Sequence, residues 1–232
     1  MTTRALPLGP LPWPSDARDA ETARDRASER QVAAGLDAVA DGGYWWADSG
    51  TDGRERLVVP PTDVGWTVDR TVDGPLVTLP DPWTATRSGG RSIDSATDRL
   101  GAIAGELPAS GTVVLLAGGV IGERLHAHLM DTSVQALGYD FVTAPEDALY
   151  LINEYRTKPT LGAGLVGTGE EPSPSTIHDR VRWIRENTPA QEFDGVRAVP
   201  TRSPVALSWP RTVDLFERLA AGIERVVEND EA

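Results

Sequence analysis

The sequence predicts an α/β fold, with residues 92–232 forming a mostly parallel sheet that has helices on both faces. From residue 112 onward, short apolar runs alternate with segments of helical periodicity. Single helices separate successive strands, which is the chain order typical of parallel sheets. The alternative is an α+β fold, in which the glycine-rich segment 161–166 and the last two strands pair antiparallel.

Residues 1–14 contain four prolines and are predicted to form an extended arm, because proline at this density excludes a helix. The leucines and the tryptophan of the arm would contribute no burial of apolar surface if the arm lay in solvent. We therefore expect the arm to dock, either on its own domain or on another subunit. Residues 15–41 are predicted to be a helix that Ser15 can cap and that Gly42 can end.

The next segment has short β-like runs at 56–59, 64–68 and 75–79, separated by Asp-Gly pairs. Such pairs favour hairpins, so the sequence predicts a small antiparallel hairpin region here. The predicted domain organisation is an arm at 1–14, a helix with the hairpin region at 15–83, a linker at 84–91 and an α/β domain at 92–232.

Within the α/β domain, apolar periodicity and the positions of glycine and proline define each element. The predicted helices are 92–107, 121–137, 145–155, 176–187 and a last helix that begins at Pro210. The predicted strands are 112–117, 139–143, 161–166, 195–199 and 205–209.

Acidic residues number 35 against 22 basic residues, which gives a formal net charge of −13, and Lys158 is the only lysine. A dense carboxylate surface stays hydrated in concentrated salt, where screening removes self-repulsion. This composition is typical of proteins from halophilic archaea and their viruses, with a GC-rich actinobacterial origin as the alternative. No basic stripe is present, so the sequence argues against a nucleic-acid partner.

The chain has no cysteine, which excludes disulfides, thiolate zinc sites and cysteine nucleophiles. No apolar run approaches the ~18 residues that would indicate a membrane span. The first residues do not have the pattern of a secretory signal. We therefore expect a soluble protein that is cytoplasmic or part of a virion, with no metal and no cofactor in the favoured interpretation.

The turn after the strand 112–117 partly resembles the dinucleotide fingerprint G-x-G-x-x-G, although Ala117 takes the first position. Glu123 lies just inside the following helix and would repel a phosphate there. A compact packing turn is the competing explanation. If the turn does bind a nucleotide, the residues predicted to contact it are Gly118, Gly119, Gly122, Glu146 and Asp147.

No catalytic set is predicted. His126 and His128 are two residues apart, and such positions do not share a face of a helix, so no metal site is expected. No G-x-S-x-G motif is present to carry a serine nucleophile. Residues 154–156, just before Lys158, are expected at the edge of the sheet where strands end, a place that ligands favour.

These observations support two functional hypotheses. The favoured one is a non-enzymatic assembly subunit of a larger complex in a halophilic archaeon or its virus, for example a virion component, oligomeric through itself or other protein subunits. The alternative is a Rossmann-like enzyme or ligand sensor that binds a nucleotide or a sugar phosphate. In the favoured hypothesis the residues expected at subunit contacts are Leu6, Leu8, Leu11, Trp13, Tyr44, Trp45 and Trp46.

Overall fold

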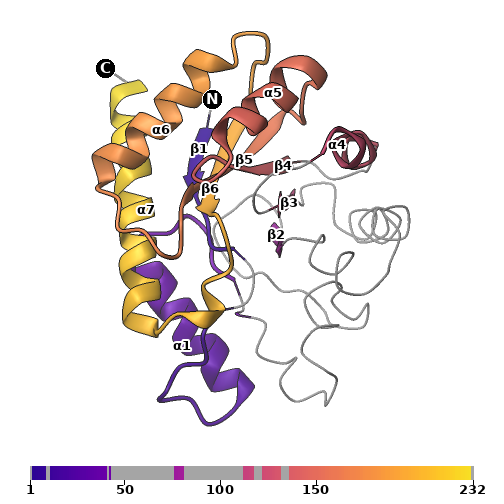
Figure 1. Ribbon diagram of the computed structural model, residues 1–232. Helices are drawn as coiled ribbons and strands as arrows, with labels where there is room; N and C mark the ends of the chain where they lie inside the picture. Colours follow the sequence, from indigo (N-terminus) through magenta and orange to yellow (C-terminus); the bar gives the residue numbers. More distant parts are fainter. Residues whose placement is uncertain are drawn as a thin grey trace.

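The computed structural model describes residues 2–8, 11–40, 42, 76–80, 112–117, 122–131 and 136–230. These residues contain a six-stranded sheet in the order β1-β6-β5-β4-β3-β2, and every neighbouring pair is parallel (Figure 1). The predicted α/β class is therefore confirmed, and the antiparallel alternative is wrong. The strands are β1 (Thr2–Ala5), β2 (Leu76–Pro80), β3 (Thr112–Ala117), β4 (Ala136–Asp140), β5 (Thr160–Val166) and β6 (Gly195–Pro200).

Several helices begin where the sequence supplies a cap or a proline. The Asp19 side chain caps the first helix by accepting a hydrogen bond from the Thr22 amide at 2.8 Å, and Ser173 caps α6 through the Thr176 amide at 3.2 Å. Pro145 and Pro174 occupy first-turn positions, where a missing N–H costs nothing. The described helices are α1 (Ala20–Ala33), α4 (Glu123–Met130), α5 (Pro145–Tyr155), α6 (Pro174–Asn187) and α7 (Trp209–Asp230).

The strand order is cyclic: β2 to β6 lie side by side in sequence order, and β1 lies beside β6. This is the neighbour order of a (β/α) barrel, in which the first strand meets the last. A Rossmann sheet instead reverses its order at a switch point, where the dinucleotide binds. The described strands have no such reversal, so the Rossmann-like expectation is wrong.

The two faces of the sheet carry different clusters of apolar residues. On one face, alternate strand residues pack against α5, α6 and α7, which line the same side of the sheet (Figure 1). The other face carries a smaller buried cluster of Leu6, Leu8, Ala38 and Val199. The first face is the main core, and it includes Leu137, Tyr139, Leu161, Leu165, Val196, Ala198, Ile177, Val181, Phe216 and Leu219.

The N-terminal segment is part of this fold. Thr2–Ala5 pairs with β6, and the Leu6 amide donates to the Ala198 carbonyl at 2.8 Å. Leu6, Leu8 and Leu11 are at most 2% exposed within the chain itself. Of the two docking possibilities, the structure has the segment docked on its own domain, and these three leucines are not available for subunit contacts.

Trp13 differs from the leucines that precede it, because it is 41% exposed, and its indole N–H donates to the Ala17 carbonyl at 3.2 Å. The remaining predicted subunit-contact residues, Tyr44, Trp45 and Trp46, lie outside the described residues. The same holds for the predicted strands 56–59 and 64–68, for the whole linker 84–91 and for the helix 92–107.

Several predicted boundaries are corrected by the structure. The strand predicted at 75–79 exists as β2, but it pairs parallel with β3 rather than in a hairpin. The first helix is shorter than 15–41, because Asp19 caps its start and Gly35 adopts a positive φ of 80° just after its end. Residues 205–209 are not a strand, because Pro204–Ala206 form a 3₁₀ turn that leads into α7.

The strand predicted at 139–143 lies three residues earlier, at Ala136–Asp140, and the preceding helix ends at Met130 instead of residue 137. Gly138 follows the predicted helix 121–137 directly, but it does not end a helix, because it lies in the middle of β4 beside Gly162 of β5. A glycine pair facing each other across two strands leaves no side chain on that face. Periodicity alone does not distinguish this use of glycine from a helix stop.

Replacing Leu6 with alanine tests whether the N-terminal segment belongs to the core. We expect the free energy of unfolding to fall by about 2–5 kcal/mol, because a fully buried leucine is truncated. Urea unfolding measures this change. The control is Val32→Ala on α1, where the side chain is 65% exposed and the change should stay within about 0.5 kcal/mol. Equal, small effects of the two substitutions would mean that the segment is a peripheral arm.

Candidate functional site

Ligands of parallel α/β sheets bind at the edge where the strands end, which we call the carboxyl edge. In this chain β4, β5 and β6 end at Asp140, Val166 and Pro200. The turns after them begin α5, α6 and α7, so this edge is built from strand ends and helix starts. Polar side chains here are the first candidates for a site.

Asp140 is the carboxylate placed most deeply at this edge, and it is 1% exposed. Its Oδ1 accepts hydrogen bonds from the Val142 and Thr143 amides, both at 2.9 Å, and its Oδ2 accepts from the Thr143 hydroxyl at 2.5 Å. Asp140 therefore both shapes the turn into α5 and brings a negative charge to the end of β4. Asp140 was not among the site residues predicted from the sequence, although a carboxylate directly after an apolar strand run is a usable signal.

Further carboxylates surround the ends of β3 and β4. Glu146 and Asp147 are exposed in the first turn of α5, and Glu123 is exposed in the first turn of α4. Helix N-termini stabilise such charges. This part of the edge is therefore negative and disfavours a phosphate group by Coulomb repulsion.

The residues predicted for nucleotide binding are only partly described. Gly118 and Gly119 lie outside the described residues. Gly122 is the exposed N-cap of α4, and no side chain caps the helix there. Glu146 and Asp147 lie at the carboxyl edge, as a ligand site requires, but their charge suits a cation better than a phosphate.

The loop after β5, residues 167–173, is held by arginines from the following helices. Arg180 of α6 donates to the Leu165 carbonyl at 2.5 Å and to Glu170 at 3.2 Å. Arg211 of α7 forms an ion pair with Glu171. Arginine forms such multiple contacts because its guanidinium is a rigid fork of donors. The loop is thereby fixed beside the end of β5, which favours a preorganised edge.

A buried polar chain links α4, β4 and the segment before β5. The Tyr139 hydroxyl donates to Thr157 Oγ1 at 2.6 Å, and His126 Nε2 lies 2.9 Å from the same hydroxyl oxygen. Since the hydroxyl hydrogen goes to Thr157, His126 Nε2 donates to the Tyr139 oxygen. Burial lowers the pKa of His126 and raises the pKa of Tyr139. His126 is buried and contacts the Tyr139 hydroxyl, whereas His128 is half-buried.

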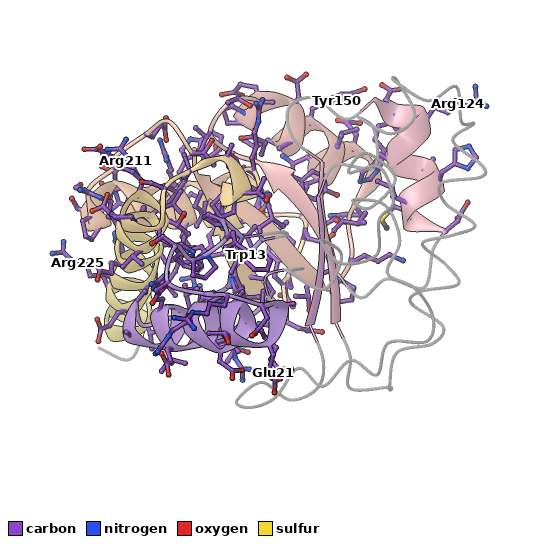
Figure 2. The ribbon with its side chains drawn as sticks, turned by 90° about the horizontal axis from the view of Figure 1, so that it is seen from below. Trp13, Glu21, Arg124, Tyr150, Arg211 and Arg225 are labelled. Carbon is purple, nitrogen blue, oxygen red and sulfur yellow. The ribbon has the colours of Figure 1, made fainter. Side chains whose placement is uncertain are left out.

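An aromatic pair lies on the surface between α4 and α5 (Figure 2 labels Tyr150). The Tyr150 hydroxyl donates to Glu123 at 2.8 Å, and the rings of Tyr150 and Tyr155 meet edge to face with centroids 6.0 Å apart. Hydrogen bonds with Tyr155 and with Glu123 raise the pKa of Tyr150. The contact ties the start of α4, next to the carboxyl edge, to α5.

Lys158, the only lysine, has a structural contact: its ammonium donates to the Met130 carbonyl at the end of α4, at 2.8 Å. A cation at a helix C-terminus is favourable, because the last carbonyls carry partial negative charge. Residues 154–156 were expected at the carboxyl edge, and this is wrong. The helix of a β-α-β unit returns to the opposite edge, so these residues lie where β5 begins.

The described residues contain neither a grouped set of metal-binding side chains nor a membrane-crossing helix. Among them, no three histidine, aspartate or glutamate side chains are grouped so that they could hold a metal ion. None of the helices in the described ranges is long and apolar enough to cross a membrane.

Comparison with known proteins identifies the fold. No protein-family model and no curated protein matches this sequence. Among solved structures, a B12-independent methionine synthase from Shewanella sp. W3-18-1, in complex with selenomethionine, is similar with a TM-score of 0.63 and 16% identity, covering 99% of this chain and 98% of that chain. A putative vitamin-B12-independent methionine synthase from Listeria monocytogenes is similar with a TM-score of 0.53 and 12% identity, over 96% of each chain.

This likeness corrects the favoured functional hypothesis. A structural assembly subunit or virion component was expected, but the chain has, over nearly its whole length, the fold of chains described as methionine synthases. The burial of Leu6, Leu8 and Leu11 in the chain's own core removes the main support for the assembly hypothesis. The fold is therefore one used by metabolic enzymes.

The buried His126 predicts a pH dependence of stability. Its pKa is lowered in the folded chain, whereas the unfolded chain has a value of about 6.5. Above that pH both states are neutral and no stability is lost. As the pH falls below it, the unfolded state binds the proton first, so the free energy of unfolding falls until the folded-state pKa is passed.

Urea unfolding between pH 7.5 and 5.5 measures this slope. We expect His126→Gln to flatten it, whereas His128→Gln on the same helix, outside the Tyr139 chain, should keep the wild-type slope. An unchanged slope in His126→Gln would show that other groups cause the dependence.

Proposed function

We propose that this protein binds methionine, or an amino acid closely similar to it, at the carboxyl edge of its sheet. The observation that carries the proposal is the likeness, over nearly the full length of both chains, to a methionine synthase whose structure is in complex with selenomethionine. Ligands of barrel-type α/β folds bind at this edge in essentially every characterised case. The proposed ligand, methionine or a close analogue, would therefore bind at the edge where ligands of such folds usually bind.

The charges at the carboxyl edge support an amino acid over a phosphorylated ligand. Asp140, Glu146 and Asp147 lie at or just after the end of β4. An α-ammonium group is attracted to these carboxylates, and a charged hydrogen bond of this kind contributes about 1.5–3 kcal/mol. A phosphate at the same place would be repelled.

Preorganisation supports the same location. The two backbone amides and the hydroxyl on Asp140 fix the turn after β4, and Arg180 fixes the loop after β5. A carboxylate that is already held in place loses little conformational freedom when a ligand arrives. Burial of the apolar thioether side chain of methionine would then add to the affinity.

Calorimetric titration with L-methionine and L-selenomethionine tests the proposal. We expect saturable binding of both and a raised melting temperature. Norleucine, which has a methylene group in place of sulfur, should bind more weakly, and AMP should not bind. If no amino acid binds and AMP does, the proposal is wrong.

Asp140→Asn tests the role of the carboxylate, because it removes the charge and keeps the shape of the turn. We expect the dissociation constant for methionine to rise about tenfold or more, which corresponds to the loss of one charged hydrogen bond. The matched control is Asp25→Asn on α1, an exposed aspartate that pairs with Arg24. Equal affinities of the two variants would exclude Asp140 from the site.

A further inference from the structure

Two tyrosines of α5 form an exposed corner of aromatic rings between α4 and α5, which we call the aromatic corner. The rings of Tyr150 and Tyr155 meet at 84° with centroids 6.0 Å apart, and the two residues are 48% and 45% exposed. Tyr150 lies at the surface beside α4 (Figure 2). The face of an aromatic ring carries negative partial charge and attracts cations, so two exposed rings at right angles are suited to a cationic ligand.

Hydrogen bonds and packing hold the aromatic corner in place. The Tyr150 hydroxyl donates to Glu123 of α4 at 2.8 Å and is also hydrogen-bonded to Tyr155. The Tyr155 ring lies against the buried His126, with ring centroids 6.2 Å apart. Rings that are already fixed at their mutual angle lose little conformational freedom when a ligand arrives.

The charges around the aromatic corner also favour a cation. Glu123 brings a carboxylate to the Tyr150 hydroxyl, and α5 contains Glu146, Asp147 and Glu154 but no basic residue. Arg124 follows Glu123 in the chain, but it lies on the opposite side of α4 from Tyr150 (Figure 2). This surface of α4 and α5 therefore attracts a positive ligand and repels an anion by Coulomb interaction.

We propose that the aromatic corner and Glu123 bind a small organic cation with a trimethylammonium head group, for which choline is the simplest probe. Such a head packs its methyl groups on the ring faces, and the carboxylate supplies the opposite charge. A primary ammonium group is strongly hydrated and gains less from the rings. A metal ion is disfavoured, because the described residues offer no group of three metal-binding side chains. The site lies between two helices and does not involve Asp140, so it is independent of the methionine proposal.

Calorimetric titration of the full chain with choline, at constant ionic strength, tests the site. We expect saturable binding, and the uncharged analogue in which carbon replaces the nitrogen should bind about fivefold more weakly or less, because it lacks the cation–π attraction. Methionine should not compete with choline, and Asp140→Asn should leave the choline affinity unchanged. Absence of choline binding, or equal binding of the uncharged analogue, would overturn the proposal.

Two substitutions locate the bound cation. Glu123→Gln removes the charge and keeps an acceptor for Tyr150, and Tyr155→Leu removes one ring at an exposed position. Each should raise the dissociation constant for choline about fivefold or more. The control Glu21→Gln changes an exposed glutamate of α1 (Figure 2) and should have no effect. Unchanged affinity in Tyr155→Leu, with a melting curve like that of the wild type, would show that choline binds elsewhere.

A peptide that carries trimethyllysine offers the same head group and distinguishes the two sources of this chemistry. We expect the peptide to bind no more tightly than choline, because the proposed contacts are made by the head group alone. Clearly tighter binding of the peptide would identify a protein side chain as the ligand and would overturn the assignment to a small molecule.

Discussion

The pairing of the first strand with the last is the constraint on which the rest of the structure depends. β1 contains only four residues, yet its pairing with β6 makes the strand order cyclic. The two faces of the resulting sheet carry different clusters of side chains. Bringing such distant segments together costs loop-closure entropy, but this cost grows only slowly with length. The backbone ladder, the Leu6 contact with Ala198 and the burial of Leu6 and Leu8 offset it.

The cyclic order also determines where chemistry can occur. All described strands run in the same direction, so their ends meet at one edge, and that edge carries Asp140, the acidic start of α5 and a loop held by Arg180. The polar groups elsewhere have structural contacts: Lys158 caps α4, and His126, Tyr139 and Thr157 satisfy one another beneath α4 and α5. Some buried donors, two of them on Arg197, find no hydrogen-bond partner among the described residues.

Much of the second half of the fold could be predicted from the sequence, because its elements have strong local signals. The strand 112–117 and the helix 145–155 have the predicted bounds, and the strand at 195–199 is one residue longer. The role of residues 2–8 could not be predicted, since proline density indicates an extended chain without indicating its partner. Asp140 was missed although its own signal is local, because the sequence does not show which strand ends meet at the same edge of the sheet.

Amide hydrogen exchange of the first strand is the most direct test of this account. The Ala5 and Leu6 amides donate to Asp37 and to Ala198, within a segment that the account treats as a core strand. We expect them to exchange only through openings close in free energy to global unfolding, as amides of β5 and β6 do. Fast exchange of Ala5 and Leu6, while the amides of β6 stay protected, would show that the first strand frays independently and would contradict the cyclic fold.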